Sequence, residues 1–290
     1  MSTPNESSNS NYYAGFTVEP LPTSTIDPDN PPWSVGSAVL VWLASVAALV
    51  GVQLFAVLGY GLFHYGFALE ELRRSIPTDR NLILISITAV LPTHILTLGI
   101  VWALVTGFGK RPFWKTLGWD WGRDFGFWTS AGLAIAMLLL GGAITKLLGG
   151  SETQLDQIIG SSTAARFAVA FLATATAPLV EEVVYRGVLY PALQRAIGAL
   201  WAVIGVSTLF TLVHVLQYSN NLGVITAISL LSLALTIVRA RARRLLPCFV
   251  IHLVFNGIQS LVIIFEPYMR QLSTSTDPQA ALLTLLVRVV

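Results

Sequence analysis

Three short groups of polar residues stand inside otherwise apolar stretches of the sequence, and the first contains two adjacent acids followed by a base. Glu181 and Glu182 precede Arg186 in the sequence Glu-Glu-Val-Val-Tyr-Arg. On a helix, Glu182 and Arg186 share a face with the acid first, which is the favourable order for an ion pair. Glu181 lies about 100° away around the helix and is left free to act as a general base. The alternative is a charge network that only joins helices.

The second group is an aromatic residue followed one helical turn later by a histidine. Phe210 and His214 lie on one helix face, so Phe210 could form a wall of a site. A turn near Gly198 separates this helix from the one that carries Glu181, and Glu181 and His214 are about equally far from it. An antiparallel pair of helices therefore places them at similar depth, where a carboxylate and an imidazole can share one water molecule. The alternative is a hydrogen-bonded core histidine.

The third group is His252 and Asn256, which also share one helix face because they are four residues apart. Both offer neutral hydrogen-bonding groups that could stabilise an oxyanion. Their alternative role is polar contact between membrane helices. We interpret His94, in an earlier apolar stretch, as structural, and the single cysteine, Cys248, as a small apolar filler. The HExxH, nucleophile-elbow, P-loop and dinucleotide-binding motifs are absent from the sequence.

The helices that must position these groups are indicated by composition. The 290 residues are 54% hydrophobic and only 11% charged, with a mean hydropathy of +0.70, whereas roughly a quarter of the residues of a soluble domain are charged. A net charge of +2 gives no strong field for nucleic acid, and one cysteine excludes an internal disulfide framework. The sequence therefore predicts an integral membrane protein whose main partner is the lipid bilayer.

Apolar runs predict an all-α, polytopic transmembrane bundle of about seven helices over residues 33–290, because one span needs ~20 apolar residues. A polar tail at 1–32 cannot build a core and is expected to be disordered. The expected spans lie within residues 30–69, 81–109, 125–145, 167–193, 196–238 (two spans) and 245–265. Residues 110–128, rich in tryptophan and cations, are expected at the headgroup layer, and residues 277–288 as a short amphipathic helix.

Arginines between the last two spans give the orientation. Arg239, Arg241, Arg243 and Arg244 crowd this loop, which the positive-inside rule places in the cytoplasm. Seven spans then put the N-terminal tail and the loop at 110–128 on the same side. Because His252 lies only eight residues beyond Arg244, or ~12 Å along a helix, we expect a site within the membrane that opens toward this side.

The three groups, in this order, resemble the CPBP family of intramembrane proteases, which includes the type II CAAX prenyl endopeptidases and bacterial bacteriocin-processing and immunity relatives. The family pattern is EExxxR, then FxxxH, then HxxxN or HxxxB. The sequence matches it at Glu181 to Arg186, Phe210 to His214 and His252 to Asn256. The resemblance covers roughly residues 166–264, which we take as the core of the site. It implies hydrolysis of a peptide bond in a membrane-associated protein or peptide.

By motif position, the resemblance implies that Glu181 activates water with His214, and that His252 and Asn256 stabilise the oxyanion. Glu182, Arg186 and Phe210 would support them. Both a metal-dependent and a metal-free mechanism are open. No cofactor is required by the pattern, but Glu181, His214 and His252 could ligate zinc and leave one position for water. The substrate, prenylated or not, is not identified, and the bacterial relatives favour the plasma membrane of a bacterium.

Two other readings use the same residues. A non-proteolytic immunity or scaffold protein on the same fold predicts that Glu181→Ala leaves biological activity unchanged. A proton-coupled transporter would use Glu181 and His214 as a relay; it predicts internal repeats, which are not visible in the sequence, and uptake in proteoliposomes.

Overall fold

The computed structural model describes residues 26–66 and 68–274, and these contain helices and no strands. The elements in chain order are α1 (Val35–Tyr65), α2 (Leu69–Ser75), α3 (Arg80–Thr88), α4 (Val90–Thr106), α5 (Phe113–Leu117), α6 (Phe127–Leu148), α7 (Gln154–Ser161), α8 (Thr163–Phe171), η1 (Leu172–Thr176), α9 (Ala177–Glu182), η2 (Val183–Leu189), α10 (Tyr190–Ile197), α11 (Ala199–Tyr218), α12 (Leu222–Ala242) and α13 (Leu246–Thr274). The predicted helix at 277–288 and most of the predicted tail lie outside the described residues.

Seven helical stretches of the described chain are long and apolar enough to cross a membrane, which confirms the predicted all-α bundle. They are Val35–Tyr65, Arg80–Thr106, Phe127–Leu148, Thr163–Ile197, Ala199–Tyr218, Leu222–Ala242 and Leu246–Met269. Large apolar side chains cover their outer faces, for example Phe55, Phe63 and Leu216, each at least 80% exposed. Such a surface suits lipid and not water, so the protein is an integral, multi-pass membrane protein.

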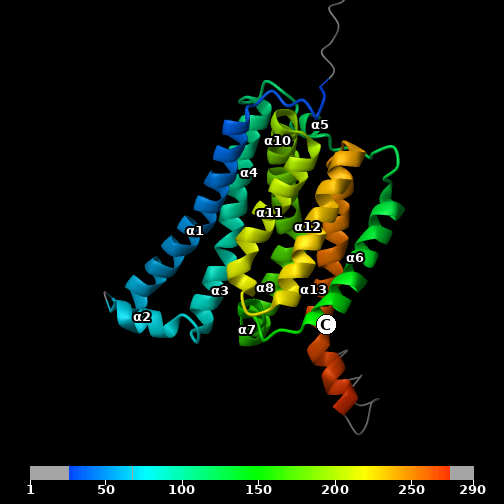
Figure 1. Ribbon diagram of the computed structural model, residues 1–290. Helices are drawn as coiled ribbons and strands as arrows, with labels where there is room; N and C mark the ends of the chain where they lie inside the picture. The colour runs from blue at the N-terminus through cyan, green and yellow to red at the C-terminus, as the bar shows by residue number, and fades with distance from the viewer. Residues whose placement is uncertain (1–25, 67, 275–290) are drawn as a thin grey trace, which may run out of the picture.

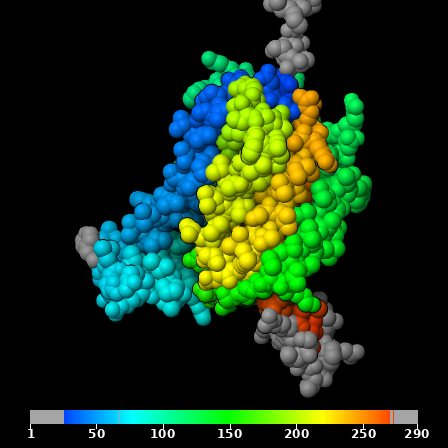
Figure 2. Space-filling view, viewed as in Figure 1, coloured from blue at the N-terminus to red at the C-terminus, as the bar shows by residue number. Residues whose placement is uncertain are grey.

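The spans pack around the fourth one, which is itself built from five consecutive elements, α8 to α10. α12 packs between α11 and α6, and α13 packs against α6, α8 and α9 (Figure 1). On the other side, α1 contacts α4 and η2, and it leans away from α11 toward the end that carries α2. Figure 2 shows the same divergence between α1 and α11 on the molecular surface.

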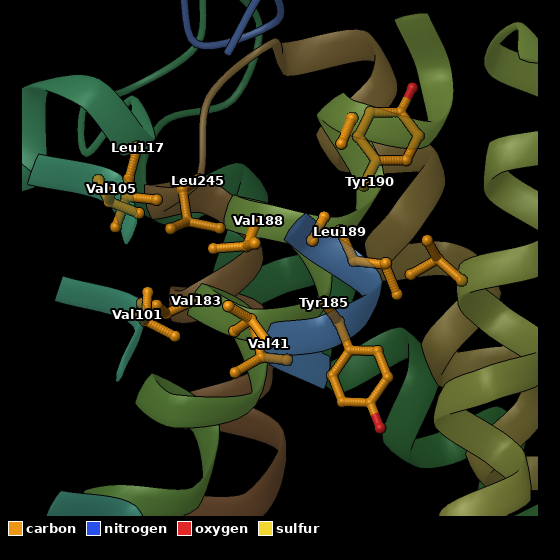
Figure 3. Packing of buried hydrophobic residues seen from close by; sticks show 14 of the residues in the cluster. Val41, Val101, Val105, Leu117, Val183, Tyr185, Val188, Leu189, Tyr190 and Leu245 are labelled. Carbon is orange, nitrogen blue, oxygen red and sulfur yellow. The ribbon is translucent and has the colours of Figure 1, made fainter. Parts of the chain in front are cut away.

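The largest apolar cluster surrounds η2. Val183, Val188 and Leu189 are fully buried there, and they pack with Val41 of α1 and Val101 of α4. Figure 3 shows these side chains converging on η2 from the neighbouring helices. The segment beside the predicted acids is therefore held by contacts on all its faces.

Three segments that are distant in sequence meet at one end of the bundle. The backbone amide of Leu245 donates to the carbonyl of Gly118 at 2.8 Å, and Arg239 and Arg243 both bind the carboxylate of Asp29. The N-terminal segment, the tryptophan-rich loop and the arginine-rich loop thus share one side, as expected because an even number of spans separates each loop from the N-terminal segment. Residues 26–32 of the expected tail are part of this assembly.

At the opposite end, Asp79 joins α1 to α3. Its carboxylate accepts hydrogen bonds from the hydroxyls of Tyr60 and Tyr65 at 2.9 and 2.8 Å and caps α3 through the amides of Asn81 and Leu82. Burial by itself raises the pKa of Asp79, but the hydrogen bonds from both tyrosines and both amides outweigh it, so this pKa lies below its usual value.

Candidate active site

The fourth span departs from α-helical geometry twice, and each departure ends at a proline. In η1, the amide of Ala177 bonds to the carbonyl of Leu172, five residues earlier, which is the π-helical pattern. The next residue, Pro178, has no N–H, so the carbonyl of Ala173 loses the donor that would continue the pattern. The side-chain amide of Asn256 on α13 donates to that carbonyl at 2.9 Å instead.

The second departure follows the same rule. In η2, the amide of Tyr190 bonds to the carbonyl of Tyr185, again five residues earlier. Pro191 then lacks the N–H that would bond to the carbonyl of Arg186. Nε of Arg239 on α12 donates to this carbonyl at 3.1 Å. Side chains from two other helices therefore complete the backbone hydrogen bonding of the fourth span, and both acids lie between these two points.

Glu182 and Arg186 form the ion pair that their spacing predicts. Nη1 of Arg186 is 3.0 Å from Oε1 of Glu182, and both side chains are fully buried. The guanidinium also donates to the Thr236 hydroxyl and to the carbonyl and hydroxyl of Ser232 on α12. Its carbon lies 4.7 Å from the ring centroid of Phe210, a cation–π contact. Oε2 of Glu182 is buried and has no partner within the described part of the chain.

His252 joins the two acids. Its Nδ1 is 2.8 Å from Oε1 of Glu182, and because an ionised carboxylate can only accept, Nδ1 carries the hydrogen. The other ring nitrogen, Nε2, faces Oε2 of Glu181 at 3.7 Å. Glu182 thus fixes the orientation of the imidazole, while the Glu181 side chain remains 25% exposed. Glu181 is the accessible carboxylate of the pair, as its position around the helix predicts.

His214 contacts Phe210 through both its ring and its Nδ1. Its Nδ1 donates to the carbonyl of Phe210 at 2.8 Å, so in the neutral ring Nε2 is the acceptor. The ring stacks on Phe210 at 4.7 Å between centroids, and Phe210 in turn meets His252 edge-on at 6.1 Å. Phe210 therefore contacts both imidazoles. Among the described residues, His214 makes no hydrogen bond to Glu181, and its other ring contact is a stack with Tyr218 at 6.5 Å between centroids.

Two further polar contacts lie on the fourth span close to the acids in sequence, and sequence reasoning did not assign them to the site. His94 on α4 contacts the hydroxyl of Thr176 in η1, with Nδ1 2.9 Å from Oγ1. The hydroxyl of Tyr185 accepts a hydrogen bond from Nε1 of Trp42 at 3.0 Å. The only signal in the sequence was a histidine within an uncharged span, which packing explains equally well.

The tentative zinc ligands do not converge on one point among the described residues. No group of three or more His, Cys, Asp or Glu side chains in residues 26–66 and 68–274 is arranged to hold a metal ion. Glu181 and His252 are adjacent, whereas the contacts of His214 are with Phe210 and Tyr218. The tentative zinc set of Glu181, His214 and His252 therefore gains no support from the arrangement and stays a prediction.

Comparison with known proteins gives one match. Residues 163–258 match the family model described as type II CAAX prenyl endopeptidase Rce1-like, which is about a third of the 290 residues. The matched segment contains the three sequence groups and agrees with the resemblance to the CPBP family. No curated protein and no solved structure matched the chain.

Proposed function

Because the Rce1-like segment contains all seven site residues predicted from the sequence, we propose that this protein is an intramembrane endopeptidase that hydrolyses a peptide bond of a membrane-associated protein or peptide. The observation that carries the proposal is the arrangement around His252. A buried ion pair holds one ring nitrogen through Glu182, and the other nitrogen faces the accessible carboxylate of Glu181 at 3.7 Å.

Glu181 is the proposed general base. It accepts a proton from water, and the resulting hydroxide oxygen bonds to the carbonyl carbon of the substrate. His214 supports this step, because its Nδ1–H is engaged by the Phe210 carbonyl and its Nε2 can accept a hydrogen bond from the same water. When the tetrahedral intermediate collapses and the C–N bond breaks, the proton held by Glu181 passes to the departing amine nitrogen.

His252 and Asn256 are the proposed oxyanion donors. His252 donates through Nε2 when both ring nitrogens carry hydrogens, because its Nδ1–H is already bonded to Glu182. Asn256 uses one amide hydrogen on the Ala173 carbonyl and has the other for the oxyanion.

The substrate is proposed to be a CAAX-type or other membrane-associated polypeptide, with or without a prenyl group. The site supports this class because Glu181 lies in the middle of the span Thr163–Ile197, where soluble proteins have no access. We place the protein in the plasma membrane of a bacterium, with its N-terminus and the arginine-rich loop of 239–244 in the cytoplasm.

The test is cleavage of fluorogenic lipidated and unlipidated CAAX-type peptides by purified protein in lipid. Glu181→Gln conserves volume and should abolish cleavage while leaving expression unchanged. Glu152→Gln, at an exposed acid outside the spans, is the matched control and should retain the wild-type rate. A chelator arm with metal add-back separates a metal-dependent from a metal-free mechanism. Equal cleavage by wild type and Glu181→Gln would refute the proposal, and turnover of neither would favour the immunity or scaffold reading.

A further inference from the structure

The segment that precedes and begins α1 makes side-chain hydrogen bonds to the middle of the fourth span. Nε1 of Trp33 donates to the carbonyl of Val188 in η2 at 3.1 Å, and Nε1 of Trp42 donates to the hydroxyl of Tyr185 at 3.0 Å. An indole N–H can only donate and needs one acceptor when buried. Both tryptophans thus use their single polar atom on the helix turn beside the candidate site.

A buried ion pair makes a third connection from the same segment. Nη1 of Arg239 is 2.6 Å from Oδ1 of Asp29, with the two side chains 0% and 7% exposed. The remaining donors of Arg239 are Nε, which bonds to the Arg186 carbonyl, and Nη2, which bonds to the Pro28 carbonyl at 3.2 Å. A guanidinium buried to this extent needs a counter-charge. Asp29 supplies it, so the N-terminal segment keeps Arg239 on the carbonyl that Pro191 leaves without a backbone donor.

These contacts end on the residues that orient the site. The Arg186 backbone is held by Arg239, while its side chain holds Glu182, and Glu182 holds His252 in position opposite Glu181. A displacement of η2 would therefore change the distance between Nε2 of His252 and the Glu181 carboxylate. Positioning errors of about 1 Å at a reacting centre can lower rates ~10²-fold.

We propose that Asp29, Trp33 and Arg239 hold η2 in its π-helical conformation and so fix the distance between His252 and Glu181. We call these three residues the positioning strap. The inference rests on the proposed function for its catalytic consequence. Asp29 and Trp33 lie outside the matched segment of 163–258, so this strap adds a requirement that the family-like segment does not contain. None of the three residues touches the reacting atoms.

The test uses the full-length protein in lipid with two mild variants. Trp33→Phe removes the indole donor, and Asp29→Asn removes the charge opposite Arg239 and Arg243. The matched controls are Trp128→Phe, at a tryptophan that is 83% exposed, and Asp124→Asn, at an exposed aspartate in the loop of 110–128. Hydrogen–deuterium exchange of residues 183–190 is measured beside kcat and KM for the cleavable peptide.

In both strap variants, the amide hydrogens of residues 183–190 should exchange about tenfold faster than in the wild type, and those elsewhere in the spans should not. The loss of one buried hydrogen bond raises the population of the locally opened segment by about this factor. They should lower kcat about three- to tenfold with KM unchanged, whereas both controls should match the wild type. Exchange like that of the controls would overturn the strap, and so would faster exchange spread over the whole protein. Local acceleration in a protein that cleaves no peptide would support the strap and count against the proposed function.

Discussion

The buried pair of Glu182 and Arg186 is expected to stabilise the protein far less than the loss of either partner destabilises it. Arg186→Met keeps an extended apolar side chain but leaves the Glu182 carboxylate fully buried, with His252 as its only remaining donor among the described residues. Breaking a buried ion pair from one side costs about 3–5 kcal/mol. We therefore expect Arg186→Met to lower the free energy of unfolding by about that amount.

Glu182→Gln should cost a similar amount for the opposite reason. It leaves the fully buried Arg186 guanidinium without its counter-charge, and breaking a buried ion pair from one side costs about 3–5 kcal/mol. The new amide N–H₂ takes the place of Oε2, or of Oε1 after a flip; in the first orientation it lies where the carboxylate oxygen had no partner, and in the second it faces two donors.

The double variant Glu182→Gln/Arg186→Met removes both charges together, and it should be destabilised by about as much as either single variant. The coupling free energy is then about 3–5 kcal/mol, measured by equilibrium unfolding of all four proteins in mixed micelles. The control cycle uses the exposed pair of Glu70 and Arg73, for which we expect a coupling below about 1 kcal/mol. Additive effects at Glu182 and Arg186, within ~0.5 kcal/mol, would refute the reasoning.

Gly223→Ala should destabilise the protein by about 1–3 kcal/mol, because the added Cβ would lie 2.7 Å from the backbone of the facing helix α6. Gly205→Ala is the control: its Cβ would meet nothing within 4 Å, so the variant should be neutral or stabilising. Thermal unfolding of both variants checks this. Asp79→Asn should lower the thermal midpoint above about pH 4. The difference from wild type should shrink as the pH falls, because a lowered pKa stabilises the fold only while the carboxylate is ionised; a difference that stays constant as the pH falls would contradict this. Asn256→Ala should lower turnover by ~10²–10³ if the free amide hydrogen of Asn256 binds the oxyanion. The variant should also destabilise the fold by about 1–3 kcal/mol, because the Ala173 carbonyl loses its donor. Full turnover would exclude the oxyanion role.

The apolar pattern predicts the spans because lipid imposes one simple requirement, a continuous run of apolar residues long enough to cross it. It does not predict where a span changes its internal geometry. The second span is divided at Ala89 into α3 and α4, and the fourth contains two π-helical segments. These changes depend on which side chains of neighbouring helices meet the backbone, and that information is not local.

Charge and spacing predict part of the site for an equally physical reason. The pairing of Glu182 with Arg186 depends only on helical periodicity, and it is present. The partner of His252 could not be predicted, because it depends on how α13 rotates against α9. His94 was not assigned to the site because a histidine in an apolar span has the same pattern whether it packs or acts, and its contact with Thr176 depends on how α4 packs against η1.

Prolines inside a span predict which backbone carbonyls need a donor from another helix, and the spacing of polar residues alone does not. A proline inside a span removes one backbone donor, so a carbonyl four or five residues earlier must find a donor elsewhere. Pro178 does this to Ala173, which binds Asn256, and Pro191 does it to Arg186, which binds Arg239. Asn256 therefore has a structural task before any catalytic one. The loss of turnover in Asn256→Ala therefore includes the cost of leaving the Ala173 carbonyl without a donor. The measured loss is larger than the contribution of the oxyanion contact alone.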